Sequence, residues 1–327
     1  MAGARGADHV VIAPAERDAK GRFRNPDGGP ASQSLLRLAR LLLQGSGTPW
    51  PKSLTDPPEP LLPNVPRDHA GFTFIGHSTF LIRLEDGTTI LTDPIFSERC
   101  SPLAWFGPKR VRPPAIDLEA LPRIDAVLVS HGHYDHLDLP SLRALHARWQ
   151  PRILTGIGHA ELMARSGIPG AVELNWGETA PLPRGHRATY VPMRHFSARG
   201  IHDRARALWG GFAVEATSGG RLIFCGDTAA GGHLDVIGAH FGGFDAALIP
   251  IGAYEPNWFM QAVHITPEQA LDAQLQLRAR TAIGMHFATF KLTQEAIDEP
   301  AQRLLAARGA QDFRVPRFGE SIILPMA

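Results

Sequence analysis

The segment Ser130-His131-Gly132-His133-Tyr134-Asp135-His136 follows directly on the apolar run Ala126–Val129 and places three histidines and one aspartate within six positions. Such residues do not belong in a core, because burying them without partners costs several kcal/mol of desolvation. The run before them is typical of a strand covered on both faces. On a loop leaving that strand, the first two histidines project the same way and can bind one ion, while Asp135 and His136 can bind another. Imidazole and carboxylate are ligands that Zn²⁺ prefers in catalytic sites, so the segment predicts a metal centre.

Three further candidate ligands stand where later predicted strands end. The segment 131–136 supplies four ligands, so two metal ions require more. The strands and the residues that follow them are Ala188–Pro192 with His195, Arg221–Cys225 with Asp227, and Thr281–Met285 with His286. A lone histidine after a strand is more often structural, but together with the histidine-rich segment these residues form one pattern. We therefore expect all of them to converge on a pair of metal ions.

The pattern from Gly71 onward predicts a layered α/β sandwich. Further strands are expected at Phe72–Ile75, Phe80–Leu84, Thr88–Thr92, Arg152–Thr155, Leu208–Ala216 and Ala246–Ile251. One helix is expected from about Asp138. Another is expected from Thr266, where the next residue is proline and a glutamine three positions on completes a capping box. Many strands with helices between them, and no glycine-rich nucleotide motif, favour this architecture.

The composition is that of an ordinary globular chain. Of 327 residues, 44% are hydrophobic and 20% charged, and Lys plus Arg (33) nearly balance Asp plus Glu (32). The formal charge of +1 gives no sign of a broadly basic surface, so we expect no nucleic-acid partner. Two cysteines exclude a disulfide scaffold and a cysteine-rich zinc site. The first 20 residues lack an apolar segment, and no stretch is long enough to span a bilayer, so we expect a cytoplasmic protein.

Two segments bear on membrane binding. Residues 1–70 form a Pro/Gly-rich arm ahead of the domain 71–327, and the arm contains a short amphipathic helix at Ser34–Gln44. This helix either packs on the main domain or lies on a membrane surface. The basic run Lys109, Arg110 and Arg112 is expected to be solvated, with attraction to anionic head groups as the alternative.

The histidine-rich segment, a later lone histidine, the run Gly226-Asp227-Thr228 and a final histidine together resemble the metallo-β-lactamase superfamily. More narrowly, the chain is similar to the family of N-acylphosphatidylethanolamine-hydrolysing phospholipases D and their bacterial relatives. The stretches that carry this narrower resemblance are Leu91-Thr92-Asp93-Pro94-Ile95-Phe96-Ser97, Gly107-Pro108-Lys109-Arg110, Ile124-Asp125-Ala126-Val127-Leu128-Val129-Ser130, Ile249-Pro250-Ile251-Gly252-Ala253-Tyr254-Glu255-Pro256, Trp258-Phe259-Met260 and Glu299-Pro300. Phe23-Arg24-Asn25-Pro26 in the arm agrees, so the similarity covers most of the chain.

The resemblance implies a four-layer αβ/βα sandwich with an N-terminal extension and two Zn²⁺ per chain. Its implied ligands are His131, His133 and His195 for one ion, Asp135, His136 and His286 for the other, and Asp227 as a bridge. A hydroxide shared by two cations about 3.5–4 Å apart is a strong nucleophile near neutral pH. The implied reaction is its attack on the phosphorus of N-acylphosphatidylethanolamine, which releases phosphatidic acid and an N-acylethanolamine. Asp135, Asp227 and His264 are the expected catalytic residues.

Four residues near the expected site have two interpretations each. His77 either lines the active site, where it supports a metal ligand or contacts substrate, or is a satisfied core histidine. Tyr254 either donates to a substrate phosphate oxygen or packs. His264 matches a family position associated with substrate binding, against an ordinary loop histidine. Asp93 is expected to accept hydrogen bonds rather than to bind metal.

The chain departs from the family pattern around the site but not at a proposed ligand. The departures are Arg194, Phe196, Ala229-Ala230, Val263 and Phe287-Ala288. Because such positions form pocket walls, these departures bear on the choice of substrate and not on the hydrolytic machinery. The alternatives are a hydrolase of the same fold acting on a cyclic phosphodiester, a lactone or a nucleic acid, and a non-catalytic membrane-associated binding protein. Two associations stay open: peripheral attachment to the inner face of the membrane, and a homodimer.

Overall fold

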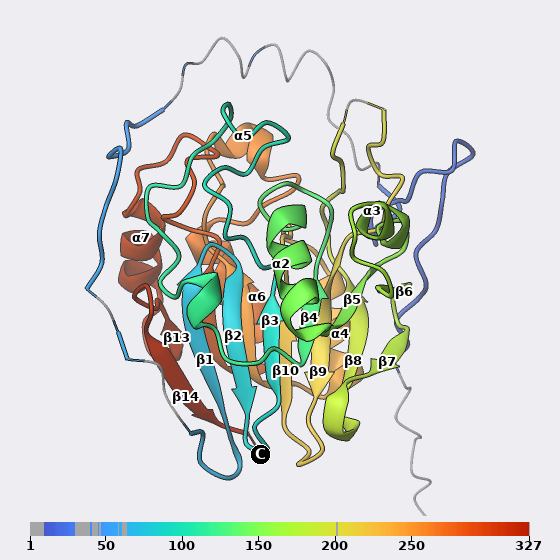
Figure 1. Cartoon of the computed structure of the whole chain (residues 1–327). Coiled ribbons are helices and arrows are strands. Elements are labelled where there is room, and N and C mark those ends of the chain that lie inside the picture. Colours follow the sequence, from blue (N-terminus) through green and yellow to red (C-terminus); the bar gives the residue numbers. More distant parts are fainter. Residues whose placement is uncertain are drawn as a thin grey trace, which may run out of the picture.

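The computed structural model describes residues 10–29, 40, 45, 47–57, 59–60, 64–200 and 202–326, and it confirms the expected sandwich (Figure 1). Two seven-stranded sheets pack face to face, and helices cover their outer faces. The helix predicted at Ser34–Gln44 falls, except for Arg40, outside the described residues. Within the described part of the chain, no helix combines the length and the apolar character needed to cross a bilayer.

The first sheet is built from residues 69–174 together with the last strand of the chain. Its spatial order is β14-β1-β2-β3-β4-β5-β6. The strands are β1 His69–Gly76, β2 Thr79–Leu84, β3 Thr89–Thr92, β4 Ala126–Val129, β5 Arg152–Gly156, β6 Val172–Leu174 and β14 Ser321–Pro325. Because β14 pairs antiparallel with β1, the end of the chain completes the sheet that its first strand begins.

The second sheet is built from residues 179–314. Its spatial order is β13-β12-β11-β10-β9-β8-β7. The strands are β7 Thr179–Pro181, β8 Arg187–Pro192, β9 Gly210–Glu215, β10 Arg221–Phe224, β11 Phe244–Pro250, β12 Ala279–Met285 and β13 Phe313–Arg314.

The strands that precede the candidate ligands run parallel within each sheet. In the first sheet, β1 and β3 are both antiparallel to β2, and β3 is parallel to β4. In the second, β8 and β10 are both antiparallel to β9, and β10, β11 and β12 are parallel. Equivalent ends of parallel strands meet at one edge of a sheet, so the residues that follow these strands gather at one end of each sheet.

Helices complete the outer layers. Those described are α2 Leu139–Trp149, α3 Ala160–Arg165, α4 His233–Phe241, α5 Asn257–Met260, α6 Pro267–Gln276 and α7 Glu299–Ala307, with 3₁₀ turns at Leu118–Ala120 and Pro183–Gly185. Strand β4 shows why the layers form. Val127 and Val129 join the cluster that holds Leu142 of α2, whereas Ala126 and Leu128 join the core between the sheets. On the other side, α6 packs on β11 and β12 and contacts α4 and α7.

Several sequence predictions can be compared with these elements. Strand β4 has the expected bounds, and the capping box is present, because Thr266 Oγ1 accepts from Gln269 N while the Gln269 side chain accepts from Thr266 N. The strand predicted at Leu208–Ala216 begins at Gly210 instead. The reason is that Leu208 N donates to Ile157 O at 2.7 Å, outside the ladder of the second sheet.

Candidate active site

The candidate ligands come together at the end of the sandwich where their strands finish. Two groups of four residues place their ligand atoms within 4.8 Å of one another. The first group is His131, His133, His195 and Asp227, and the second is His77, Asp135, His136 and His286. Every residue expected from the sequence as a ligand therefore lies in one cluster, and His77 is added to it.

The first group presents three imidazole nitrogens and one carboxylate oxygen. Nδ1 of His133 lies 2.8 Å from Nε2 of His131 and 3.2 Å from Nε2 of His195. Oδ2 of Asp227 lies 3.9 Å from Nε2 of His131 and 3.7 Å from Nε2 of His195. The four atoms lie within 4.8 Å of one another, and they match the donor types and number of a tetrahedral zinc site.

The second group is arranged around the Asp135 carboxylate. Oδ2 of Asp135 lies 3.0 Å from His77 Nε2 and 3.3 Å from His286 Nε2. Its distance to His136 Nε2 is 3.4 Å. Oδ2 of Asp227 lies 3.2 Å from His136 Nε2 and 3.3 Å from His286 Nε2. Asp227 thus contacts both groups and occupies the position that a bridging ligand requires.

Three imidazoles are oriented through the ring nitrogen that points away from the cluster. The pairs are His131 Nδ1 with Ser130 Oγ at 2.9 Å, His136 Nδ1 with Asp93 Oδ2 at 2.6 Å, and His195 Nδ1 with Val263 O at 2.8 Å. Such partners fix the tautomer and the ring plane of a metal-binding histidine. Asp93 therefore accepts hydrogen bonds, as expected from the sequence.

The backbone at the site is held in an unfavourable conformation. His77, Asp93 and His286 have positive φ angles of 56°, 30° and 62°. Non-glycine residues rarely adopt this region, and such strain persists where surrounding contacts enforce it. His286 N donates to His77 O at 2.8 Å, so the ends of β12 and β1, one from each sheet, are joined directly behind the cluster.

Burial keeps the histidines of the first group neutral. It holds the pKa of His131 well below its ordinary value, and it lowers the pKa of His133 to about 4 and that of His195 to about 3. Near neutral pH these imidazoles therefore carry a free lone pair, which is the form that binds metal.

The charged carboxylates make the binding of positive charge at the site favourable. Burial alone would raise the pKa of Asp227, but the charges of His136 and His286 outweigh it and hold that pKa well below its usual range. Burial likewise opposes the charge of His286, yet Asp227 and Asp135 raise its pKa to about 9. The same carboxylates, with Asp93, raise the pKa of His136 well above its ordinary value despite burial.

Several ligand atoms have no hydrogen-bond partner among the described residues. They are Nε2 of His136, Nε2 of His286 and Oδ1 of Asp227, and all are buried. Buried polar atoms in native proteins are almost always satisfied, and an exception calls for an explanation. Coordination of divalent metal ions would satisfy these atoms and meet the demand for positive charge, so the residues present fit a metal centre.

A cavity of about 270 Å³ opens over the cluster. One of its walls is apolar and is formed by Phe196, Phe259, Met260, Val263 and Leu292. Two of these residues, Phe196 and Val263, are departures from the family pattern, so they lie where pocket-wall residues were expected. Arg204 also lines the cavity, with its guanidinium carbon 3.6 Å from the centroid of the Phe196 ring.

Besides His77, two residues were expected to contact substrate, His264 and Tyr254, and the structure places them differently. His264 lines the cavity, its Nε2 lies 3.9 Å from Asp227 Oδ2, and burial lowers its pKa to about 3. Tyr254, in contrast, is not among the residues that line the cavity: its hydroxyl donates to Glu299 Oε1 at 2.8 Å, and Arg303 lies over its ring. These contacts favour the packing interpretation of Tyr254.

The basic run is solvated only at Lys109, whose side chain is 50% exposed, so the prediction of a solvated run is wrong for Arg110 and Arg112. Arg110 is buried and donates to Ile95 O at 2.7 Å and to Ser97 O at 3.0 Å. Arg112 pairs with Asp56 at 2.9 Å. Backbone carbonyls that lack strand partners accept from these guanidinium groups, which turns two of the three charges into structural cross-links.

The sequence reasoning missed two residues that support the site. Arg204 is one, since it brings a cation to the cavity wall. The other is Asn25 of the arm, whose Oδ1 accepts from the backbone N of His195 at 3.0 Å. Phe23 of the same arm is buried in the core between the sheets. The resemblance of Phe23-Arg24-Asn25-Pro26 to the family was the available signal for this contact.

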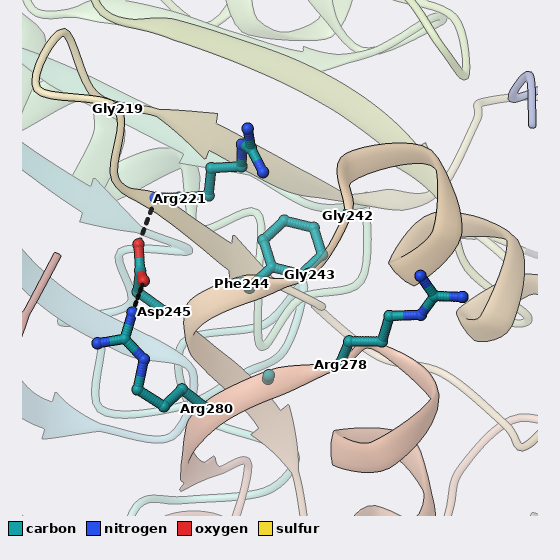
Figure 2. A pocket seen from close by; sticks show the side chains of 9 residues that line it. Gly219, Arg221, Gly242, Gly243, Phe244, Asp245, Arg278 and Arg280 are labelled. Carbon is teal, nitrogen blue, oxygen red and sulfur yellow. Dashed lines mark hydrogen bonds and ion pairs between the residues drawn. The ribbon is translucent and has the colours of Figure 1, made fainter. Parts of the chain in front are cut away.

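A second pocket lies at the start of β11 and β12, at the opposite end of these strands from the metal-binding cluster. Three arginines line it: Arg221, Arg278 and Arg280 (Figure 2). Asp245 neutralises part of their charge, because it accepts from Arg221 N at 2.8 Å and forms an ion pair with Arg280. Asp245 is the one carboxylate, histidine or cysteine among its lining residues, and it is paired with arginine, so these residues do not form a group of metal ligands.

The fold and the cluster define an enzyme class, the metal-dependent hydrolases of the metallo-β-lactamase fold. Residues 88–287, more than half of the chain, match the family model described as the beta-lactamase superfamily domain. The chain belongs to this superfamily.

Individual relatives sharpen the comparison. The chain is 35% identical over 311 residues to the N-acyl-phosphatidylethanolamine-hydrolyzing phospholipase D 1 of Caenorhabditis elegans, covering 89% of this chain and 85% of that protein. A metal-dependent hydrolase of Rubrobacter xylanophilus is 29% identical over 240 residues, covering 71% and 88%. Among solved structures, a possible metal-dependent hydrolase from Veillonella parvula has a TM-score of 0.62 at 17% identity, covering 77% and 98%. That structure shares the fold.

Proposed function

We propose that this chain is a zinc-dependent phosphodiesterase that binds two Zn²⁺ and cleaves N-acylphosphatidylethanolamine to phosphatidic acid and an N-acylethanolamine. The observation that carries the proposal is the pair of four-residue groups joined by Asp227 beneath an apolar-walled cavity. The 35% identity to a phospholipase D of this specificity supports the choice of substrate. A cytoplasmic location, with attachment to the inner face of the membrane, belongs to the same proposal.

The first group would hold one ion through His131, His133 and His195, and the second would hold the other through Asp135, His136 and His286. Asp227 would contact both. His77, 3.0 Å from Asp135, would either join the second ion or orient Asp135. Bound together, two divalent cations lower the pKa of a water molecule and neutralise charge on phosphate oxygens.

The residues of the cavity would position the phosphodiester. Arg204 attracts its negative charge, and a guanidinium pairs well with phosphate oxygens. Neutral His264 can donate a ring N–H to a phosphate oxygen or to the leaving oxygen. The apolar wall around Phe196 and Val263 accepts hydrocarbon next to the phosphate and excludes water from it. In the net reaction a water oxygen bonds to phosphorus, the bond from phosphorus to the ethanolamine oxygen breaks, and that oxygen leaves with a proton.

The test combines metal analysis with hydrolysis by the purified wild type and by Asp227→Ala and His133→Ala. We expect about two zinc ions per wild-type chain and fewer in each variant. We also expect hydrolysis of bis(p-nitrophenyl) phosphate and of N-acylphosphatidylethanolamine to fall at least about 100-fold. Asp245→Asn, which alters a buried carboxylate at the other end of the strands, is the matched control and should keep both.

The possible results separate the alternatives. Unchanged hydrolysis in both variants would disprove the metal mechanism. Metal-dependent hydrolysis of the soluble diester without cleavage of the lipid would leave the hydrolase class intact and reject the lipid substrate. A wild type that binds no metal and hydrolyses neither compound would favour the binding-protein alternative.

A further inference from the structure

An ordered hairpin at residues 99–109 holds two aromatic side chains in solvent. Trp105 is 75% exposed and Phe106 65%, and Leu103 beside them is 42% exposed. The ring partner found for Trp105 in the described chain is Phe106, at 6.0 Å between centroids. Large apolar residues gathered on one exposed tip mark an interaction site more often than chance exposure does.

The hairpin is a built structure rather than a loose loop. Arg99 and Lys109 form an antiparallel bridge, and Cys100 N donates to Pro108 O at 3.1 Å. Arg99 Nη1 donates to Gly107 O at 2.6 Å. Gly107 has a φ of 104°, and a Cβ there would meet Ser101 Oγ at 2.6 Å. These contacts fix the backbone so that the tip points outward, even though burying the two aromatic rings would make a monomer more stable.

The base of the hairpin rests on the active site. Cys100 is buried in a small cluster with Ile95 and Phe290, and Tyr134 from the histidine-rich segment packs against it. Arg110, at the end of the hairpin, pairs with Phe290, whose ring lies 5.3 Å from that of His77. Leu292, two positions further on, lines the cavity and is 37% exposed. In Figure 1 the segment between β3 and β4 reaches the same end of the molecule as α5, which carries cavity residues.

We propose that Leu103, Trp105 and Phe106 insert into the surface of a lipid bilayer and so bring the cavity to substrate held in the membrane. This inference deepens the proposed function and rests on it. Aromatic side chains favour the boundary between head groups and acyl chains. Lys109, at the base of the hairpin, is 50% exposed and pairs with Glu98, so the apolar side chains rather than charge carry the insertion.

A second copy of the chain is a poorer occupant of the tip. Stable protein interfaces bury about 800 Å² on each partner. Two aromatic side chains and a leucine offer at most about 600 Å², since an aromatic residue buries about 150–250 Å². A bilayer, by contrast, accepts a small apolar tip and gains from every side chain that enters it.

The experiment compares the wild type with W105A/F106A and with L275A/L305A, a control pair of exposed leucines on α6 and α7. Metal-loaded proteins are sedimented with phosphatidylcholine vesicles containing anionic phosphatidylglycerol. We expect W105A/F106A to bind at least about tenfold more weakly, and the control pair to bind as the wild type does. Hydrolysis of N-acylphosphatidylethanolamine in vesicles should fall in parallel, while hydrolysis of soluble bis(p-nitrophenyl) phosphate and the melting temperature should not change.

A spectroscopic measurement identifies the residue that enters the lipid. Vesicles with brominated acyl chains should quench wild-type tryptophan fluorescence, and Trp105→Phe should remove most of that quenching. Equal vesicle binding by W105A/F106A and the wild type would overturn the inference while the phosphodiesterase assignment stands. A wild type that binds vesicles but hydrolyses no phosphodiester would overturn the phosphodiesterase assignment and leave membrane binding by the tip standing. Loss of a dimer in W105A/F106A, measured by analytical ultracentrifugation, with vesicle binding kept, would assign the tip to self-association.

Discussion

Asp93 accepts hydrogen bonds from two neighbours of the metal-binding cluster without belonging to either group of four. Ser130 N donates to it at 2.7 Å, and His136 Nδ1 lies 2.6 Å from it. Its carboxylate therefore positions both the start of the histidine-rich segment and one ring of the second group. Burial alone raises the pKa of Asp93, and the fixed donors around it partly oppose that effect.

Replacing this carboxylate tests its positioning role. Asp93→Asn keeps the volume but puts an amide where the His136 ring needs an acceptor, so we expect metal affinity to fall about 10- to 100-fold. Competition with a chelating dye measures the affinity. Asp245→Asn removes a buried charge of the same kind far from the cluster and should leave the affinity unchanged. Equal affinity in Asp93→Asn and the wild type would show that the ring is held by packing alone.

His159 provides a pH test at one residue. Burial lowers its pKa to about 4, while Nε2 lies 3.0 Å from Leu208 O. In the unfolded chain a histidine titrates near about pH 6.5. Between these values the unfolded state binds more protons, so the contribution of His159 to stability is complete above about pH 6.5 and declines as the pH falls toward about 4.

The expected consequence is a pH-dependent effect of His159→Gln. Near pH 7.5 the substitution should destabilise the protein, because the buried neutral ring is lost. Near pH 5 that penalty should be smaller by about 2 kcal/mol, at about 1.4 kcal/mol per pH unit. Urea unfolding of both proteins at the two pH values gives the difference and cancels the titration of the other histidines. A penalty independent of pH would contradict the low pKa.

The residues of the His/Asp cluster could be predicted because few side chain types bind metal and those present follow strands. Their neighbours could not be predicted in the same way. Arg204 reaches the cavity, and the Tyr254 hydroxyl reaches Glu299, through packing between distant segments. For His77 the sequence indicated only part of the outcome. Its position after Gly76 suggested that it lies near the site, but not that its ring contacts Asp135.

At the scale of elements, the turn after β10 is the tightest link between fold and site. Gly226 has a φ of 61°, and a Cβ there would meet Ser130 Cβ at 2.7 Å and Gly210 O at 3.0 Å. The turn aims Asp227 at both groups of ligands. We expect Gly226→Ala to lower the free energy of unfolding by about 2–4 kcal/mol and to weaken metal binding.

Gly170→Ala separates crowding from backbone strain. Gly170 also has a positive φ, 84°, but an added Cβ would meet nothing within 4 Å. Gly170→Ala should lower the free energy of unfolding by about 1–2 kcal/mol and leave metal binding intact. Chemical unfolding and metal titration of both variants measure the two effects. If Gly226→Ala and Gly170→Ala lower the free energy of unfolding equally and both keep their metal, the close approach of Gly226 to Ser130 is not needed for metal binding.

Elements were predictable where a periodic apolar run ends in polar residues, as β4 does. Others were missed: β14, with five residues, and the shorter strands β6, β7 and β13. Strand β13 has two residues and β6 has three, two of them half-buried, so neither shows a period from which a strand can be inferred. These two strands form by pairing with the exposed edges of longer neighbours, β13 with β12 and β6 with β5.

On the scale of the whole molecule, the cluster joins the two sheets. Metal bound there would stabilise the sandwich, because an unfolded chain does not hold its ligands together. We expect removal of metal with EDTA to lower the melting temperature by at least about 5 °C and to abolish hydrolysis, and added Zn²⁺ to restore both. Asp227→Asn, which lacks the shared ligand, should show a smaller shift. Equal melting temperatures with and without chelator would mean that the cluster contributes nothing to stability.

The two ends of the sandwich have separate roles. One end carries the cluster, the cavity and the exposed hairpin tip, and the other carries the arginine-lined pocket around Asp245 (Figure 2). Strand direction makes this division, since residues directly after the parallel strands lie at one end, and residues directly before the next strand, such as Gly243 and Arg278, lie at the other. Substitutions at Asp245 therefore make suitable controls for every test of the site.

The position of His286 late in the chain has a consequence for biosynthesis. A nascent polypeptide that has emerged from the ribosome as far as Asp227 can offer one group of ligands, but the other stays incomplete until β12 and His286 follow. At about 5–20 residues per second, this interval lasts several seconds. Strand β14, which completes the first sheet, emerges later still. We therefore expect hydrolytic activity only after His286 has emerged, and a polypeptide truncated before His286 should be inactive.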